Sequence, residues 1–495
     1  MTILDHLAPL QVVLPLVCAP LIVVVRRLGF AWAIATLASW ASLAIAVTLA
    51  LRVAAEGTLS YAIGNWPAPW GIEYRVDALS SYLLLLVSAI GSIVMPYARR
   101  SIVAELPREQ EYLFHAMYCL CLAGLLGITI TGDAFNLFVF MEISSLSTYV
   151  MIALGKRRQA LVASYQYLVM GTIGATFYVI GVGLLYLMTG TLNLADLAAR
   201  LRDVQEVRPL LAALSFITVG VGLKLALFPL HQWLPPAYAY APSTVSAFLA
   251  ATGTKVAVYV LLRFYFTVFG DSAVFQRVPF AGALLALSLI AMITASLVAI
   301  FQDDLRKMFA YSSVAQIGYI TLGISLGNVS GLTGAIAHLF NHGVTKGALF
   351  MLSGGIALCC GATRLSELKG LGRRMPFTSA GIVLAGLSLI GIPATAGFTT
   401  KWYLVIGALE RGMWPVAAVV VASSVLAVAY VWRFVEAAYL SEPQPGLSAR
   451  PSEPPLSMLV PAWILVAACV YFGLETSFNV GAAQAAAEFL LRGPR

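Results

Sequence analysis

Long runs of apolar residues recur along the whole chain, separated by short polar segments. Each run has about the 20 residues that a helix needs to cross a bilayer core of ~30 Å. The apolar positions are continuous and do not alternate, which favours helices over the strands of a barrel. We predict fourteen membrane spans, at residues 7–25, 29–51, 78–97, 112–131, 134–154, 161–189, 209–228, 243–267, 279–300, 308–327, 331–359, 376–392, 413–438 and 456–474.

The composition agrees with this pattern. The chain has 495 residues, of which 60% are hydrophobic and only 11% are charged, about half the charged fraction of a soluble protein. The first run follows six residues that contain neither a basic segment nor a small-residue cleavage site, so we expect a retained helix and not a signal peptide. The sequence therefore predicts an all-α polytopic membrane protein.

Two of the predicted spans are interrupted by proline and glycine. The seventh runs into Phe228-Pro229, with Pro235-Pro236 shortly after, and the twelfth reaches Pro393 and resumes at residues 398–409. Proline removes a backbone donor and breaks the helical hydrogen bonding, so each span is expected to consist of two half-helices.

The broken spans are five spans apart, and five is an odd number, so the two units that contain them would be inverted relative to each other. Broken helices at matching places in inverted repeats are typical of ion-coupled transporters. We predict N-terminal helices 1–3 in residues 1–111 and a first repeat of helices 4–8 in residues 112–268. A second repeat of helices 9–13 would occupy residues 279–438, and helix 14 with a tail would occupy residues 439–495.

The net charge of +8 does not indicate nucleic-acid binding, because the basic residues lie mostly in short loops. Assigning alternate loops to one face gives sixteen lysines and arginines on one side and ten on the other. The positive-inside rule makes the denser face cytoplasmic. We therefore expect a multi-pass protein of the inner (cytoplasmic) membrane with both termini periplasmic or extracellular.

The charged residues well inside the predicted spans are lysines and one glutamate, not arginines. Arginines stay near span ends, whereas Lys224, Lys255, Lys346 and Lys401 lie within apolar segments. A desolvated lysine can release its proton and an arginine cannot, so this choice favours groups whose charge changes. Glu142 is the only acid well inside a span, where a carboxylate must be protonated or paired. Lys224 is the natural partner, although a static ion pair that orders the bundle remains an alternative.

Two histidines extend this set of titratable groups. His338, His342 and Lys346 have i, i+4, i+8 spacing and should line one helix face over roughly 12 Å. Neutral histidine can accept and pass a proton, which would suit a relay between lysines. A polar seam satisfied by neighbouring helices is the alternative. Lys255 could link the two halves, and His231 could either belong to the relay or cap the first helix break.

These residues carry a resemblance to the antiporter-like membrane subunits shared by respiratory complex I, membrane-bound hydrogenases and Mrp-type cation/proton antiporters. The resemblance covers nearly the whole chain and is strongest at residues 140–149, 224–255 and 338–346. The Glu-Ile-Ser-Ser sequence at Glu142 and the segment 237–243 look most like the D-type subunit of the Mrp antiporter. Complex I relatives more often have histidine at the position of Tyr238.

The resemblance implies a proton pathway in which Glu142 and Lys224 form the carboxylate–lysine pair of the first half. Lys255 takes the connecting position, His338 and Lys346 take the eleventh-helix positions, and Lys401 is the terminal residue. Some relatives have glutamate at this last position, so the lysine narrows the choice of relative without settling it.

The resemblance also implies a proton-translocating subunit of a multi-subunit monovalent cation (Na⁺)/proton antiporter, which is not an enzyme and carries no cofactor or metal. Its partners would be other subunits, lipids, protons and cations, without nucleic acid. One alternative is a proton-pumping subunit of a complex I-type NADH:quinone oxidoreductase or membrane-bound hydrogenase. Another is a non-conducting scaffold.

Overall fold

The computed structural model describes residues 3–204, 206–270, 272, 280–442 and 453–492, and almost all of them are helical. The first half contains η1 (Ile3–His6), α1 (Leu7–Val25), α2 (Leu28–Glu56), β1 (Leu59–Ala62), η2 (Ile63–Asn65), β2 (Glu73–Val76), α3 (Ala78–Glu105), η3 (Arg108–Gln110), α4 (Glu111–Ile130), α5 (Ala134–Ala153), α6 (Arg158–Thr189), α7 (Leu194–Leu201), α8 (Val207–Leu225), α9 (Leu234–Tyr240), α10 (Ser243–Leu262) and the π-helical η4 (Arg263–Val268).

The described residues of the second half form helices joined by loops. It contains α12 (Phe280–Ile300), α13 (Leu305–Leu326), α14 (Val329–Cys360), η5 (Leu365–Glu367), α15 (Leu371–Arg374), α16 (Pro376–Ile390), α17 (Ala396–Glu410), α18 (Trp414–Val435), the π-helical η6 (Glu436–Leu440), α19 (Leu456–Leu474) and α20 (Ser477–Arg492).

The predicted membrane architecture is confirmed. Within the described residues, 13 helices are long and apolar enough to cross a membrane. The shorter helices α16 and α17 together form the remaining span, which gives the fourteen that the apolar runs predict. The first and last spans begin and end where they were predicted, at Leu7–Val25 and Leu456–Leu474. The ninth begins at Phe280, and the predicted residue 279 lies outside the described residues.

Both predicted helix breaks are present. The helix α8 ends at Leu225, where Ala226 adopts a left-handed conformation with φ of 61°, and the chain turns before α9. The helix α16 ends at Gly391 with φ of 88°, a conformation that glycine adopts without strain. A Cβ at Gly397 would lie 1.8 Å from the carbonyl oxygen of Ser388, so glycine lets the start of α17 pack against the end of α16.

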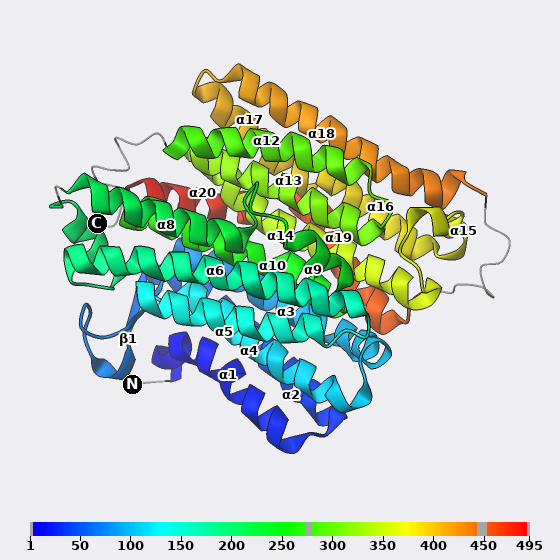
Figure 1. Ribbon diagram of the computed structural model, residues 1–495, viewed down its shortest axis with the longest axis horizontal. Helices are drawn as coiled ribbons and strands as arrows, with labels where there is room; N and C mark the ends of the chain where they lie inside the picture. Colours follow the sequence, from blue (N-terminus) through cyan, green and yellow to red (C-terminus); the bar gives the residue numbers. More distant parts are fainter. Residues whose placement is uncertain (1–2, 205, 271, 273–279, 443–452, 493–495) are drawn as a thin grey trace.

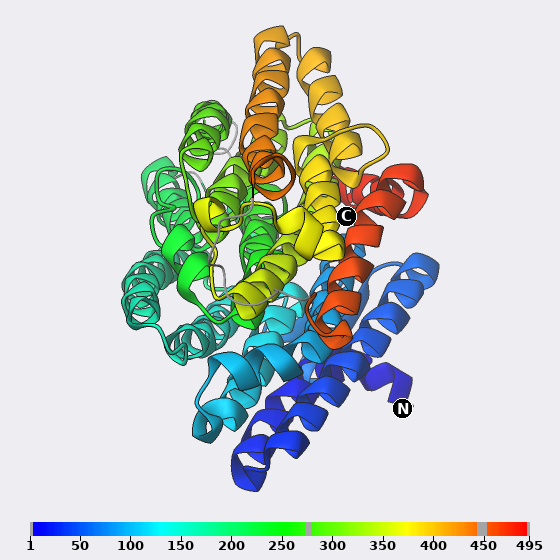
Figure 2. The same ribbon diagram turned by 90° about the vertical axis from the view of Figure 1, so that its right-hand side faces the viewer.

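Central and peripheral helices differ in burial. In the most apolar part of α10 and of α13, 89% of the residues are buried inside the protein, against 33% in α1 and α2. Figures 1 and 2 place α1 and α2 at one edge of the bundle and α17 and α18 at the opposite edge. The helices that carry Lys255 and His338, α10 and α14, therefore lie in the interior, where unpaired charge is costly.

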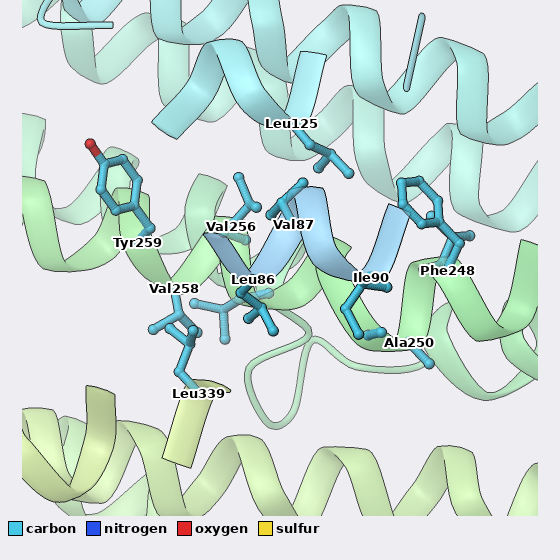
Figure 3. Packing of buried hydrophobic residues seen from close by; sticks show 14 of the residues in the cluster. Leu86, Val87, Ile90, Leu125, Phe248, Ala250, Val256, Val258, Tyr259 and Leu339 are labelled. Atoms are coloured by element: carbon cyan, nitrogen blue, oxygen red, sulfur yellow. The ribbon is translucent and has the colours of Figure 1, made fainter. Parts of the chain in front are cut away.

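The interior is packed by aliphatic and aromatic side chains from several helices. Figure 3 shows Leu86 and Ile90 of α3 beside Phe248 and Ala250 of α10, with Leu339 of α14 on the other side. The helix α10 buries 19 of its 20 residues, as expected of a helix that is apolar all round and sits among other helices. This close packing fixes where α10 can place its one charged side chain, Lys255.

Several short elements were not predicted from the sequence. The strands β1 and β2 form an antiparallel hairpin in which Leu59 pairs with Val76. The eight-residue helix α7 and the C-terminal helix α20 are also additional, and α20 packs against α14 and α3. Figure 1 shows the hairpin and both termini at the same end of the bundle, as expected for an even number of spans. The division into inverted repeats at residues 112–268 and 279–438 stays a prediction.

Candidate proton pathway

The predicted carboxylate–lysine contact is present between α5 and α8. Lys224 Nζ lies 3.2 Å from Glu142 Oε1 and donates a second hydrogen bond of 2.6 Å to Ser145 Oγ. The Lys224 side chain is 8% exposed and that of Glu142 is 23% exposed. The lysine is therefore held in the bundle, while its carboxylate partner keeps some contact with the surroundings.

The helix break after α8 helps to stabilise the buried positive charge of Lys224. Lys224 is in the last turn of α8, where the helix dipole is negative and favours a cation. Trp233, beyond the break, donates its indole N–H to the Leu223 carbonyl at 2.8 Å. The carbonyl groups at the end of α8 thus accept hydrogen bonds partly from the Trp233 side chain and partly from backbone N–H groups of the turn.

Lys401 has the corresponding relation to the second broken helix. Its ammonium donates to the carbonyl oxygens of Leu389 and Ile390 at 3.1 and 2.8 Å, at the C-terminal end of α16. A third hydrogen bond of 3.0 Å goes to Ser424 Oγ, and the Tyr319 ring centroid lies 4.5 Å away. Lys401 is therefore stabilised by dipoles and an aromatic face. No carboxylate pairs with it among the described residues.

Lys255 and Lys346 are also bound by neutral oxygens. Lys255 donates to the backbone carbonyl of Ala250 and, at 3.3 Å, to Thr254 Oγ1. Lys346 donates to the carbonyl of Phe309 at 2.7 Å and to Ser312 Oγ. Both side chains are buried. A neutral set of acceptors can hold either protonation state, whereas a carboxylate would favour the charged form.

The two histidines of α14 have different surroundings. His338 Nδ1 is 2.8 Å from Thr400 Oγ1, and its Nε2 is 2.8 Å from Gln316 Oε1. The ring of His342 stacks on that of His338 with centroids 6.0 Å apart. Neither ring nitrogen of His342 has a hydrogen-bond partner among the described residues, although the ring is buried. Both ring nitrogens of His342 are therefore available for a further hydrogen bond.

The second-half residues form a connected group. Thr400, which contacts His338, precedes Lys401 in α17, and Lys346 lies one turn beyond His342 on α14. The first-half pair is separated from this group by α10. Val256 and Gly253 of α10 line a cavity of about 40 Å³ beside Lys224, large enough for water. Among the described side chains, no hydrogen bond joins Lys224 to Lys255.

A network of two buried asparagine side chains supports the helix break between α16 and α17. Asn341 of α14 donates to the Ala396 carbonyl at 2.9 Å, at the start of α17. Asn479 of α20 donates to Asn341 Oδ1 at 2.6 Å and accepts from the Tyr82 hydroxyl of α3. The C-terminal helix is therefore tied to the half-helix that carries Lys401. Asn341 lies between His338 and His342 in the sequence, which is the only signal that could have drawn attention to it.

Other buried polar groups were missed in the sequence. Arg263 pairs with Asp77 at 2.5 Å, and both side chains are buried. Arg306 is also buried, and it donates to the Ser243 hydroxyl. His115 is buried in α4, and its Nδ1 has no partner in the described part of the chain. Each lies near the end of a predicted span, where the sequence does not show whether a side chain is buried. The His231 ring stacks on Phe228, and its Nδ1 has no hydrogen-bond partner among the described residues. Whether His231 caps the helix break or belongs to the relay stays a prediction.

The chain was compared with known families and structures. Residues 131–427 match the family described as NADH:quinone oxidoreductase/Mrp antiporter, TM. The chain is 45% identical over 489 residues to the N-type subunit of the NADH-quinone oxidoreductase of Desulforudis audaxviator, covering 95% of this chain and 96% of that one. It is 30% identical over 491 residues to the D-type subunit of the Na(+)/H(+) antiporter of Bacillus subtilis, covering 99% and 98%.

Solved structures agree with this assignment. A chain in the structure of the Mrp complex from Dietzia sp. superposes with a TM-score of 0.90 at 27% identity, covering 99% of this chain and 98% of that chain. The family match extends from Thr131, before α5, to α18 and includes every lysine described above. This protein is therefore a polytopic membrane subunit of the NADH:quinone oxidoreductase/Mrp antiporter family.

Proposed function

We propose that this chain is the proton-translocating subunit of a multi-subunit antiporter that exchanges protons for a monovalent cation, with Na⁺ as the exchanged ion. The observation that carries the proposal is the Lys224–Glu142 contact of 3.2 Å at the end of a broken helix. This contact forms a titratable pair in the first half, and three further buried lysines and two buried histidines follow in α10, α14 and α17. The D-type subunit of the Na(+)/H(+) antiporter of Bacillus subtilis, similar over nearly its whole length, supports the choice of exchange.

The mechanism is electrostatic. While Lys224 is charged, its positive charge stabilises the ionised form of Glu142. Separation of the two side chains removes this stabilisation, so Glu142 takes up a proton and Lys224 tends to release one. The two titrations are coupled, and neither residue has an independent proton affinity. Water in the cavity beside α10 would carry the released proton towards Lys255.

The second half would pass the proton along α14 to the second helix break. Lys255, His342, Lys346, His338 and Lys401 are the proposed carriers. His342 has two unbonded ring nitrogens in the described part of the chain, and His338 already contacts the hydroxyl beside Lys401. A neutral imidazole with one protonated and one free nitrogen can accept a proton on one side and release another on the opposite side.

A second candidate function is proton pumping in a redox-driven complex. It is favoured by the 45% identity to the N-type subunit of the NADH-quinone oxidoreductase of Desulforudis audaxviator. The same internal residues would serve, but the driving force would come from redox chemistry in partner subunits instead of a cation gradient. The two candidates therefore differ in partners and in the energy source.

The test is a pH-gradient assay with the complex purified together with its partners and reconstituted in vesicles. Antiport predicts that an imposed Na⁺ gradient moves protons without any electron donor, and that Glu142→Gln abolishes the movement. Redox-driven pumping predicts proton movement only with a donor and quinone. A non-conducting scaffold predicts that activity survives loss of Lys224 and Lys401. Redox subunits in the purified complex, with no response to Na⁺, would overturn the antiporter proposal.

Orientation is part of the proposal. We place the protein in the inner (cytoplasmic) membrane with both termini on the outer side, because loops with Arg99-Arg100, residues 156–158 and Arg373-Arg374 lie on the opposite face. A tag fused after Arg495 should be cleaved by protease that is added to cells whose outer membrane has been removed and whose inner membrane is intact. Protection of the tag from the protease would show the opposite orientation.

A further inference from the structure

Two small cavities lie beside successive positions of α10, where Tyr259 lines the outer cavity and Val260 lines the inner one. The outer cavity of about 30 Å³ is also lined by Thr131, Arg263 and Leu490. Leu490 lies near the end of α20, so this cavity is at the terminus-bearing end of the bundle. The inner cavity of about 40 Å³ is lined by Ile128, Val260 and Lys224. Each exceeds the ~10–15 Å³ that one water occupies. Water can therefore approach Lys224 from this end in two stages.

A tyrosine and an ion pair lie at the boundary of these cavities. The Tyr259 hydroxyl donates to the Thr129 carbonyl at 2.9 Å. Thr129 lies between Ile128, which lines the inner cavity, and Thr131 just past the end of α4, which lines the outer one. The guanidinium of Arg263 is 4.9 Å from the centroid of the Tyr259 ring. Arg263 Nη2 is also 2.5 Å from Asp77 Oδ1, with side-chain exposures of 6% and 2%. These contacts join α3, α4 and α10 at one level.

The Asp77–Arg263 pair is charged, and Asp77 also bonds to the first turn of α3. Asp77 accepts hydrogen bonds from the backbone N–H groups of Leu79 and Ser80 at 3.1 and 3.0 Å, which caps α3. Burial alone would raise the pKa of the Asp77 carboxyl, but the charge and hydrogen bonds of Arg263 hold the pKa below its ordinary value. A fixed guanidinium on this route repels incoming cations unless the carboxylate neutralises it.

Only the Arg263 side chain has to move for the ion pair to open. The helix changes from α to π at Arg263 and stays π-helical to Val268. The backbone N–H of Arg263 still bonds to the carbonyls of Tyr259 and Val260, so the backbone of α10 holds this residue in place. Rotation of the long arginine side chain would separate its guanidinium from Asp77, and the lysine side of the route would not need to move.

We propose that the Asp77–Arg263 pair and Tyr259 form a gate between Lys224 and the aqueous phase at the terminus-bearing face. The closed pair keeps the two cavities separate, and displacement of Arg263 joins them into one water route. The gate rests on the proposed function, because it gives the proton of the Glu142–Lys224 pair an exit to one side of the membrane. A pair that only fastened α3 to α10 would have no effect on access to Lys224.

The test is chemical accessibility of the inner cavity. Val260→Cys, in a chain whose six native cysteines are replaced by alanine, is treated with a membrane-impermeant cationic methanethiosulfonate in vesicles of each orientation. We expect slow labelling while the pair is intact. Adding Arg263→Gln should speed labelling at least tenfold from the terminus-bearing face and leave the rate from the opposite face unchanged. Thr131→Cys in the outer cavity serves as the reference for reagent access.

Matched variants separate gating from misfolding. Asp77→Asn retains a good helix cap while removing the negative charge, and Asp77→Asn with Arg263→Gln leaves no unpaired charge. The double variant should speed labelling of Val260→Cys, whereas Asp77→Asn alone should not, because its unpaired guanidinium repels the cationic reagent. Arg52→Gln, which breaks the exposed Arg52–Glu56 pair near the same face, should leave the rate unchanged.

Equal rates with and without the pair, or faster labelling from both faces, would overturn the gate. Because labelling requires no transport, failure of the antiporter function would appear separately, as vesicles that label as expected but move no protons.

Discussion

The most informative perturbation removes Glu142 and Lys224 separately and together. The two charged atoms are 3.2 Å apart, and at an effective dielectric constant of about 20 their gross attraction is about 5 kcal/mol. Breaking a buried pair costs about 3–5 kcal/mol because one charge is left behind. Since the Glu142 side chain is 23% exposed, water can partly replace the lysine. We therefore expect a coupling free energy of about 2–3 kcal/mol.

This magnitude predicts a ranking of stabilities. Lys224→Met leaves a carboxylate without its cation, so it should destabilise the protein more than the double variant Glu142→Gln, Lys224→Met. Stability is measured by equilibrium unfolding in mixed detergent and SDS, with the four proteins of the cycle side by side. In the same proteins, proton movement should fall at least 100-fold for either single change and no further for both, because coupled groups act as one unit.

Additive losses would refute this reasoning. If the double variant lost as much stability and as much activity as the two single changes combined, the two residues would be independent sites. Wild-type proton movement in a correctly assembled Glu142→Gln variant would remove Glu142 from the pathway. Ser145→Ala is the matched control, because it removes the 2.6 Å hydrogen bond to Lys224 without changing the charge.

Three further predictions concern the second half. Lys401→Arg should lose proton movement nearly as completely as Lys401→Ala in the vesicle assay, because arginine keeps its charge but cannot release a proton; full activity would make the residue structural. Gly397→Ala places a Cβ 1.8 Å from a backbone oxygen of α16, and its unfolding free energy should fall by about 1–3 kcal/mol or more; unchanged stability would show that the break relaxes freely. Asn479→Leu leaves the Asn341 carbonyl oxygen without its buried donor, and the unfolding free energy should fall by about 1–3 kcal/mol. Gln484→Ala on the outer face of α20 is the control and should change the unfolding free energy little. Equal effects of the two substitutions would show that the amide network does not stabilise the protein specifically.

Much of the fold follows from the apolar runs, because lipid requires continuous helices and proline requires breaks. The Glu142–Lys224 contact could also be predicted, since a single acid inside a span needs a cation. The partners of Lys255, Lys346 and Lys401 could not. They are mostly backbone carbonyls and hydroxyls, such as those of Phe309 and Ser312, which every helix offers and no sequence pattern distinguishes.

The charged residues that were missed lie at span ends, where sequence alone does not separate buried from solvated charge. Arg263 lies at the end of a predicted span, but the π-helix and the contact with Asp77 bury it. The hairpin was missed because each strand has only four residues. The helix α20 is rich in alanine and has few large apolar residues, so its apolar signal falls below that of a membrane span.

The hydrogen bonds of Lys401 have a mechanical consequence. An ammonium group has three N–H donors, and Lys401 uses them on two carbonyls at the end of α16 and on one hydroxyl of α18. Loss of the proton leaves two donors and removes the charge that the helix end attracts. In the proposed pathway, the proton on Lys401 therefore also holds α17 against α16 and α18, and its release would weaken the contacts between these three helices. The protonation of one side chain would in this way change how tightly the second helix break is packed.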